Sequence, residues 1–364
     1  MAVTARFDMA IVGAGMAGAS LAAELGAAGA RVLLLEAEDR PGYHSTGRSA
    51  AFWTESYGGA GVQPLTTASG PYLRAGGFLK ERGALTIARS ADAADLETFA
   101  REFEALGVRV DMLERAALER RIPGLLPDWT IGALEPDCSD IDVAGLHQDY
   151  LARAGRGGAE LWVRAAFSGA EPHGDGWRVH CADGRSAQAG ILINAAGAWA
   201  DEVAAMAGVP PLGFRPYLRT IAQIRTVPQP PVDLPLVLDM RETFYFKPEA
   251  GKVWLSPHDE VPSLPCDVAP EELGVAQAID RMQKVVNWTV ERVEHKWAGL
   301  RTFAPDRLPV YGFDPDHLRF FWFAGQGGFG IQTAPAAAVL AAGLIGAGTL
   351  GELDPTPYLP ARFR

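Results

Sequence analysis

The stretch Phe7-Asp8-Met9-Ala10-Ile11-Val12-Gly13-Ala14-Gly15-Met16-Ala17-Gly18 decides the fold of this chain. Its first six residues are mostly apolar and predict a short buried strand, and a helical pattern follows over about 15–29. A second apolar run over 31–36 is continuous rather than alternating, as expected for a strand buried on both faces of a parallel sheet. This strand–helix–strand unit predicts a Rossmann-like, α/β fold.

The glycine spacing at positions 13, 15 and 18 has a physical meaning in that unit. Gly13 permits the tight turn, Gly15 lets the backbone approach a pyrophosphate, and Gly18 lets helix and strand pack closely. The helix N-terminus offers free N–H groups and the positive end of its dipole to phosphates. Glu36, at the end of the second strand, can accept both ribose hydroxyls and disfavours the 2′-phosphate of NADP. The unit predicts a dinucleotide site, with a glycine-rich helix cap as the simpler alternative.

Composition narrows the class of protein. The 364 residues predict two domains at roughly 150 residues each. A net charge of −11 without a long Lys/Arg run argues against a nucleic-acid or anionic membrane surface. Three widely spaced cysteines, Cys138, Cys181 and Cys266, predict neither disulfides nor a metal site and favour a cytoplasmic location. The uncharged run over 334–350 is shorter than the ~20 residues that span a bilayer and predicts a buried helix.

The nucleotide-binding pattern returns later in the chain. Strand–glycine–helix patterns recur near residues 195 and 325. The stretches that separate the three units do not follow this pattern, and the first of them includes an amphipathic helix over 91–106. We therefore expect a Rossmann-like domain built from discontinuous segments, and a second α+β domain with an antiparallel sheet that includes 219–225, 242–247 and 252–255. The segments expected for the first domain are 1–81, 141–205 and 296–364, and those for the second are 82–140 and 206–295.

Two further helices are expected to begin near the nucleotide site. His44-Ser45-Thr46-Gly47 offers cap residues and predicts a helix start near Ser45. A second helix is expected to start near Ile331.

Four motifs outside the first unit carry a resemblance to a known family. They are Tyr43-His44-Ser45-Thr46-Gly47-Arg48-Ser49-Ala50-Ala51, Asn194-Ala195-Ala196-Gly197-Ala198-Trp199, Trp297-Ala298-Gly299-Leu300-Arg301 and Gly325-Gln326-Gly327-Gly328-Phe329-Gly330-Ile331-Gln332-Thr333. With these motifs and the glycine spacing, the chain resembles the FAD-dependent D-amino-acid oxidase superfamily over nearly its whole length. Within that superfamily it resembles the bacterial D-arginine dehydrogenase branch.

The resemblance implies FAD as the cofactor. No cysteine lies in the sequence near 299–311, where sarcosine oxidases attach flavin covalently, so we expect noncovalent FAD. The resemblance implies the following cofactor-binding residues: Gly13, Gly15, Met16, Ala17, Gly18, Glu36, Ala37, His44, Ser45, Thr46, Gly47, Ser49, Ala50, Ala51, Ala165, Ala196, Gly197, Trp199, Gly299, Gly327, Gly328, Phe329, Gly330, Ile331, Gln332 and Thr333.

The resemblance also implies a substrate site. Arg301 would pair bidentately with a substrate carboxylate, a geometry that lysine cannot reproduce. Tyr245 would add a hydroxyl to that carboxylate, although a core tyrosine is a close alternative. Arg219 falls where the family has basic residues and is expected to act at the site, with a structural ion pair as an equal alternative. Tyr57 would lie over the site. The residues expected to line the substrate pocket are Phe52, Thr54, Ala84 and Gly328.

Departures from the family pattern bear on the substrate. Ala84 falls where the D-arginine enzyme has a glutamate that holds the guanidinium group, and Phe52 replaces a histidine. We therefore expect oxidative deamination of a neutral or apolar D-amino acid, by hydride transfer to flavin N5. Oxidation of an N-alkyl amino acid or a 2-hydroxy acid, and a flavin-binding sensor or scaffold without turnover, are the alternatives.

The electron acceptor is expected to be a quinone, another acceptor, or oxygen. Trp254 and Leu255 stand near the position of the oxygen-activating lysine of sarcosine oxidases, which favours a dehydrogenase. Lys247 and Lys252 are close enough in sequence to keep an oxidase open.

Overall fold

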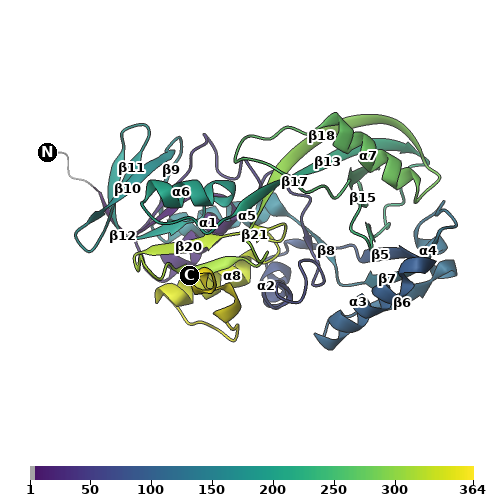
Figure 1. Cartoon of the computed structure of the whole chain (residues 1–364), viewed down its shortest axis with the longest axis horizontal. Coiled ribbons are helices and arrows are strands. Elements are labelled where there is room, and N and C mark those ends of the chain that lie inside the picture. The colour runs from purple at the N-terminus through teal and green to yellow at the C-terminus, as the bar shows by residue number, and fades with distance from the viewer. Residues whose placement is uncertain (1–4) are drawn as a thin grey trace.

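The computed structural model describes residues 5–364, and two large sheets organise it. In Figure 1 the first sheet lies on the left with both chain ends, and the second lies on the right. Their strand orders are β10-β11-β12-β1-β2-β9, with β20 on β12 and β19 on β20, and β21-β18-β13-β16-β15-β14-β5-β7-β6, with β17 on β13.

The first sheet is parallel at its centre, as the apolar runs predict. β1 pairs in parallel with both β12 and β2, and β20 adds to β12 in parallel. Neighbouring residues of β1 alternate between two cores, since Ile11 packs with α1, α5 and α8 and Ala10 packs with α6 on the opposite face. Its strands are β1 (Arg6–Val12), β2 (Val32–Leu35), β9 (Glu160–Trp162), β10 (Phe167–His173), β11 (Gly176–Cys181), β12 (Ser186–Asn194), β19 (Val310–Phe313) and β20 (Phe320–Ala324). Its helices are α1 (Met16–Ala27), α2 (Gln63–Ala75), α5 (Val143–Arg156), α6 (Ala200–Met206) and α8 (Ala334–Ile345).

The second sheet is antiparallel except where β14 pairs in parallel with β5. Ala222 and Ile224 of β13 and Val237 of β14 pack in the core that includes residues of α7 and α4. Its strands are β5 (Ala84–Arg89), β6 (Asp111–Glu114), β7 (Trp129–Glu135), β13 (Arg215–Val227), β14 (Leu236–Asp239), β15 (Tyr245–Glu249), β16 (Lys252–Ser256), β17 (Val261–Pro262), β18 (Thr289–Phe303) and β21 (Gln326–Gly327). Its helices are α3 (Ala93–Ala105), α4 (Arg115–Arg121) and α7 (Glu272–Gln283).

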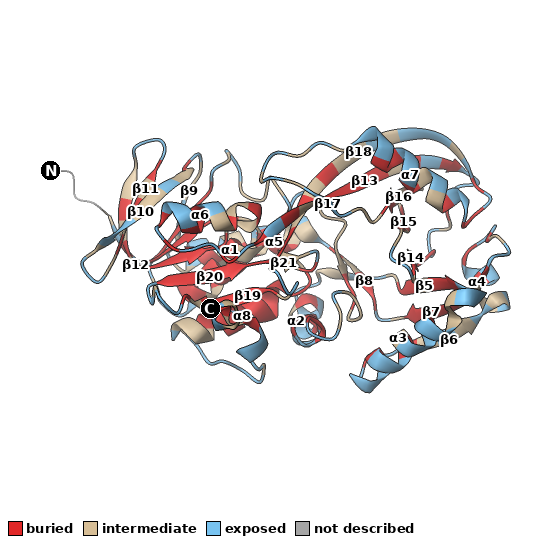
Figure 2. Cartoon of the chain, in the orientation of Figure 1, coloured by how far each residue is buried: buried red, intermediate tan, exposed pale blue. Residues whose placement is uncertain are grey.

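A small third sheet joins β3 (Phe52–Trp53), β8 (Ser139–Ile141) and β4 (Leu79–Glu81). Short 3-10 helices cover 90–92, 197–199, 356–358 and 360–363. Figure 2 shows buried residues along the strands of both large sheets and an exposed outer face on α3. The predicted fold class, a Rossmann-like sheet with a second α+β part, is confirmed.

The prediction of a helix that starts near Ser45 is wrong. Residues 41–48 form consecutive turns instead of a helix. The reason is that the two hydroxyls bind distant segments rather than capping a helix of their own: Thr46 Oγ1 accepts the Met16 N–H at 2.9 Å, and Ser45 Oγ donates to the Leu300 carbonyl at 2.7 Å. The helix expected near Ile331 begins three residues later, at Ala334, with Thr333 as its N-cap.

The expected boundary between residues 295 and 296 falls inside β18, which pairs with β13 from Thr289 to Phe303. A strand of the second sheet thus carries Arg301. Among residues 5–364 no helix combines the length and the apolar character needed to cross a membrane.

Candidate functional site

A cavity of about 590 Å³ is lined by residues of both large sheets. One end is formed by the glycine turn after β1, the end of β2 and α6, and the other by β13, β14, β15 and β18. On the second sheet, Arg219, Ile221, Leu236 and Leu238 line the cavity, while the residues that alternate with them pack under α7. The antiparallel sheet therefore uses one face for its core and the other for the cavity wall.

The end near the first sheet has the geometry of a dinucleotide site. Gly15 is the N-cap of α1, and a Cβ on Gly13 would lie 2.5 Å from the Ala195 carbonyl oxygen. Glu36 is buried, and its two carboxylate oxygens accept the Ala14 N–H at 3.3 Å and the Glu38 N–H at 3.0 Å. Each of these oxygens keeps a lone pair for a further hydrogen bond.

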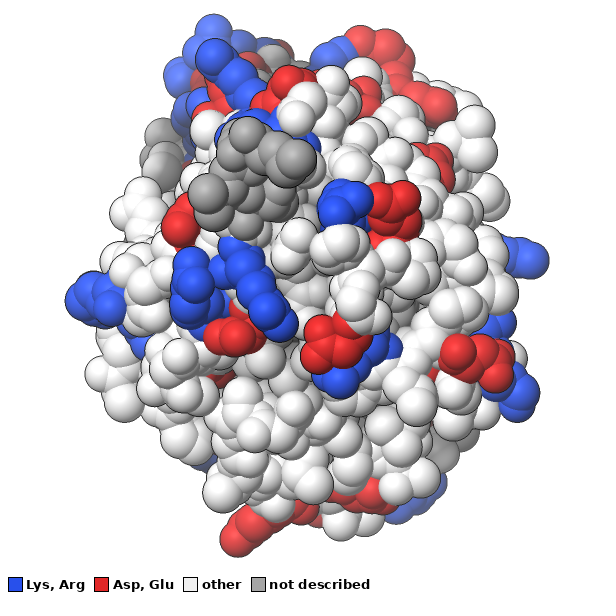
Figure 3. Space-filling view, turned by 90° about the vertical axis from the view of Figure 1, so that its left-hand side faces the viewer, with Lys and Arg blue, Asp and Glu red and all other residues white. Residues whose placement is uncertain are grey.

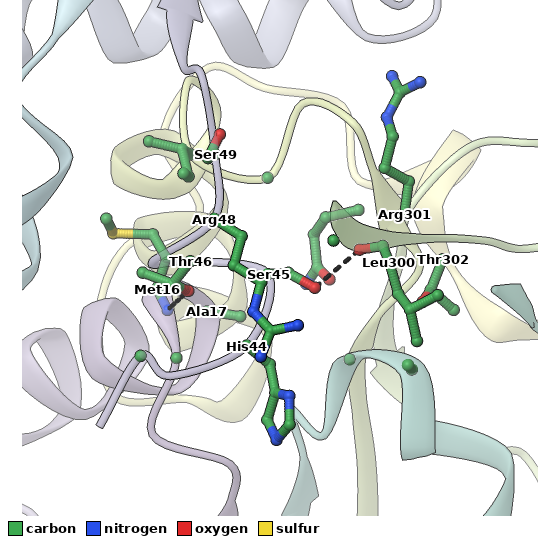
Figure 4. Close-up of a pocket in the computed structure, with 18 of the residues that line it drawn as sticks. Met16, Ala17, His44, Ser45, Thr46, Arg48, Ser49, Leu300, Arg301 and Thr302 are labelled. Carbon is green, nitrogen blue, oxygen red and sulfur yellow. Dashed lines mark hydrogen bonds between the residues drawn. The ribbon is translucent and has the colours of Figure 1, made fainter. Parts of the chain in front are cut away.

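The turn segment 41–48 crosses the middle of the cavity. Figure 4 shows the two hydrogen bonds that fix it, one from Met16 to Thr46 and one from Ser45 to Leu300. Arg48 pairs with Asp267 and donates to the Val268 carbonyl at 3.1 Å. These contacts connect α1, β18 and the loop before α7, so the segment is held from both sheets.

In Figure 4 the Arg301 side chain extends away from His44. Its side chain is 12% exposed, and its buried Nη1 has no hydrogen-bond partner in the described part of the chain. Burial, with Arg307 nearby, lowers the pKa of the Arg301 guanidinium to about 9. Its Nη2 packs so closely on Gly328 that a Cβ there would lie 1.7 Å away. This end of the cavity therefore holds a desolvated cation that lacks a full counter-charge.

A second arginine reaches the same end. Arg219 Nε donates to the Asp259 carbonyl at 2.9 Å, and its buried Nη2 also has no hydrogen-bond partner among residues 5–364. The Glu260 carboxylate lies 2.8 Å from Arg307 Nη2, 3.5 Å from Arg301 Nη1 and 3.8 Å from Arg219 Nη2. Arg219 thus lines the cavity and also lies beside the acidic groups Asp259 and Glu260.

Two aromatic side chains border the arginines. Tyr245 packs edge-on against Phe52, with ring centroids 6.5 Å apart, and against His258 at 5.7 Å. The Tyr57 ring lies 5.5 Å from the Arg301 guanidinium carbon. His258 has a strained φ of 53°, and its Nδ1 lies 2.6 Å from the Glu242 carbonyl oxygen, which assigns the proton to Nδ1. Burial, and then Arg219, lower the pKa of His258 to about 3, so its imidazole is neutral.

Most residues expected at the site line this cavity. They include Arg301, Tyr245, Tyr57, Arg219, Phe52, Thr54 and Gly328. Five do not line it: Gly18, Gly47, Ala84, Phe329 and Thr333. Gly18 packs against Gly13, and a Cβ on Gly18 would lie 1.9 Å from the Gly13 carbonyl oxygen. Ala84 is buried in a cluster with Cys138 and Leu236, so Leu236 and Leu238, rather than Ala84, face the substrate end.

Several lining residues were missed from the sequence, among them His258, Ile221, Leu236, Leu238, Arg48 and Glu38. The short apolar run Leu236-Val237-Leu238 was the available signal for a buried strand, but a continuous apolar run does not show which residues face a cavity. The histidine carries no such signal, because its position depends on the β16–β17 loop.

The lysines considered for oxygen activation lie outside the cavity lining. Lys247 is buried and pairs with Asp140 at 2.9 Å and Glu249 at 3.0 Å, and Lys252 pairs with Glu294. Cys138 and Cys181 are buried, and Cys266 is exposed and lines a small hollow with Leu300. On the face in Figure 3, acidic and basic side chains are interspersed over a mostly uncharged surface.

Comparisons with known proteins agree with this arrangement. A family model described as FAD dependent oxidoreductase (DAO) matches residues 8–344. The hydrogen cyanide synthase subunit HcnC of Pseudomonas aeruginosa is 27% identical over 270 residues, which cover 71% of this chain and 61% of that protein. Mitochondrial dimethylglycine dehydrogenase of Rattus norvegicus is 25% identical over 399 residues, which cover 97% of this chain and 45% of that protein.

Among solved structures, glycine oxidase from Geobacillus kaustophilus superposes with a TM-score of 0.86 at 22% identity, covering 99% of both chains. At that identity the likeness shows a shared fold. The aligned regions span less than two thirds of the length of both sequence relatives.

Proposed function

Because the chain belongs to the DAO family of FAD-dependent oxidoreductases, we propose that it oxidises a D-α-amino acid with a neutral or apolar side chain. The substrate would lose a hydride from Cα and a proton from its amine, and water would hydrolyse the resulting imino acid to a 2-oxo acid and ammonia. The observation that carries the proposal is the buried, incompletely paired guanidinium of Arg301 in a cavity with a dinucleotide site at its other end.

The cofactor is FAD, and the residues at the glycine turn fit it. A side chain on Gly13 or Gly15 would fill the cradle, since a Cβ on Gly15 would lie 3.1 Å from Thr46 Oγ1. We propose that Gly15 and the start of α1 hold the pyrophosphate and that Glu36 holds the ribose. The ring would lie among 45–51, Gly299 and 327–333. Bound FAD supplies a two-electron, hydride-accepting ring.

The charge at the end of the cavity that holds the arginines supports a substrate with one carboxylate. Three cations, Arg219, Arg301 and Arg307, face two acids, Asp259 and Glu260, so one positive charge is uncompensated. A single carboxylate would neutralise it and give Arg301 Nη1 an acceptor, whereas a second anionic group would have no such partner. Tyr245 would add a neutral hydroxyl donor.

The wall next to the arginines supports a neutral or apolar side chain. Phe52, Ile221, Leu236 and Leu238 line it. The acidic residues that line the described cavity, Glu36, Glu38 and Glu202, follow β2 or belong to α6 in the other half. A cationic side chain would therefore be desolvated without a counter-charge.

The chain offers a weak base for the amine. His258 is neutral with its proton on Nδ1, so Nε2 keeps a lone pair that can accept a hydrogen bond. Its pKa of about 3 makes it a poor proton acceptor. We propose that the amine proton leaves to water, with carboxylate binding at Arg301 providing the orientation.

Oxidation of an N-alkyl amino acid is the second candidate. The similarity to dimethylglycine dehydrogenase over 97% of this chain favours it. Arg301 would hold the carboxylate of that substrate in the same way.

Anaerobic titration of the FAD-loaded protein separates these candidates. D-Methionine, D-phenylalanine, D-arginine, their L-forms, sarcosine and N,N-dimethylglycine are added in turn, and bleaching of the flavin band is recorded. We expect bleaching by the apolar D-forms. Bleaching by D-arginine alone would contradict the side-chain argument, and bleaching by N-methyl compounds alone would replace the first candidate with the second.

A further inference from the structure

Glu135, the last residue of β7, is a buried carboxylate outside the cavity lining. Its two oxygens accept four hydrogen bonds from one short segment. The donors are Glu55 N at 2.6 Å, Ser56 Oγ at 2.6 Å, Thr54 Oγ1 at 2.8 Å and Ser56 N at 3.4 Å. Burial raises the pKa of Glu135, and these hydrogen bonds oppose that shift. A buried carboxylate with this many donors from one segment fixes the backbone of that segment.

The segment 54–57 leads from β3 to the substrate end of the cavity. Gln332 holds it from the other side, since its Oε1 accepts the Thr54 N–H at 3.3 Å and its Nε2 donates to the Tyr57 carbonyl at 3.2 Å. Two glycines with positive φ, Gly58 at 98° and Gly59 at 79°, follow directly. The backbone after Tyr57 is therefore a place where the chain can turn, and Glu135 and Gln332 restrain it on one side.

Tyr57 connects this segment to the arginine. Its ring lies 5.5 Å from the Arg301 guanidinium carbon and packs edge-on to Phe329 at 6.4 Å. A ring in this position excludes water from the cation and interacts with it through its face. A displaced segment 54–57 would expose Arg301 to solvent and weaken its hold on a carboxylate.

We propose that Glu135 is a positioning residue that fixes the segment 54–57, so that Tyr57 covers Arg301 and strengthens carboxylate binding. The inference rests on the proposed function in one respect, the assignment of Arg301 to the substrate carboxylate. Glu135 pairs across the sheet with Ala84, the residue expected to stand in place of a guanidinium-binding acid. Its oxygens are committed to the loop, so it is not a partner for a cationic substrate.

The test measures carboxylate affinity without turnover. Phenylacetate has a carboxylate and an apolar ring but no amine, and its dissociation constant is obtained from the shift of the flavin spectrum in the FAD-loaded protein. Four proteins form a double-mutant cycle: the unaltered chain, Glu135→Gln, Tyr57→Leu and the double variant. We expect Glu135→Gln to weaken phenylacetate binding roughly tenfold when Tyr57 is present and less than about twofold when Tyr57 is replaced by leucine. The effect shrinks because Glu135 acts on binding through Tyr57, so the two substitutions are not additive.

A matched control and a second readout keep the outcomes distinct. Asp201 also has a pKa raised by burial and accepts the Leu212 and Gly213 N–H groups, both at 3.1 Å, and those two residues do not line the cavity. Asp201→Asn should leave phenylacetate affinity unchanged. Hydrogen exchange at residues 55 and 56 should accelerate in Glu135→Gln and, more weakly, in Ser56→Ala, which serves if Glu135→Gln does not fold.

Equal weakening by Glu135→Gln in both Tyr57 backgrounds, or unchanged affinity, would overturn the proposal. Unchanged exchange at residues 55 and 56 would overturn it as well. If the unaltered chain fails to bind phenylacetate while exchange accelerates as expected, Glu135 fixes the segment and the assignment of Arg301 fails instead.

Discussion

Gly328→Ala perturbs the proposed carboxylate site by a single methyl group. A Cβ at this position would lie 1.7 Å from Arg301 Nη2 and 2.3 Å from its Cζ. The guanidinium is the end of a flexible side chain, whereas residue 328 is part of a turn, so the substitution should displace Arg301 rather than the backbone.

The size of the effect follows from that contact. Nonbonded carbon and nitrogen atoms rest roughly 3.5 Å apart, so the guanidinium must retreat by about 1.8 Å. A bidentate pair does not survive a shift of that size, because at least one charge-assisted hydrogen bond, worth about 1.5–3 kcal/mol, is lost. We expect kcat/KM for an apolar D-amino acid to fall about 10- to 150-fold.

The assay is steady-state kinetics with an artificial electron acceptor, with rates referred to bound flavin and the Tm measured in parallel. Gly155→Ala is the control, because a Cβ there meets no heavy atom within 4 Å beyond the neighbouring backbone of its own helix, and the position is inside α5. The control should keep full activity and gain slightly in Tm. Unchanged kcat/KM in Gly328→Ala at full FAD content would refute the assignment of Arg301 to the substrate carboxylate.

Three further predictions concern the cofactor and the carboxylate site. Gly18→Ala places a Cβ 1.9 Å from the Gly13 carbonyl oxygen, so α1 cannot pack on β1; we expect a lower Tm and loss of FAD by flavin-to-protein absorbance, and a fully loaded variant would contradict this. Tyr245→Phe should raise KM roughly 2- to 12-fold in steady-state kinetics, the value of one neutral hydrogen bond, and an unchanged KM would mean that the Tyr245 hydroxyl does not bind the carboxylate. Acid precipitation should release FAD into the supernatant, whereas a yellow pellet would indicate a covalent bond, with Cys266→Ser as the variant to examine.

The parts of the fold that could be predicted are those in which the determining contacts are local. The turn at Gly13, the packing of Gly18 and the acid at Glu36 lie within one unit of about thirty residues, and the spacing alone places them. The amphipathic pattern of α3, with Leu96 and Phe103 buried, is local in the same sense.

The parts that could not be predicted depend on partners far away in the sequence. Ser45 and Thr46 have the chemistry of helix caps, yet Ser45 binds a carbonyl 255 residues away and Thr46 an amide 30 residues away. The role of Glu135 depends on donors about 80 residues earlier. Pattern and propensity carry no information about such pairs, so the sequence predicted the helix wrongly and missed the carboxylate.

Product analysis tests the central claim most directly. The FAD-loaded protein is incubated with D-phenylalanine and an electron acceptor, and keto acid, ammonia and reduced acceptor are measured together. We predict phenylpyruvate, ammonia and two-electron reduction of acceptor in equal amounts, with the yield abolished in Arg301→Ala. Absence of keto acid, together with formation of an aldehyde and a primary amine from N-methyl amino acids, would contradict the claim.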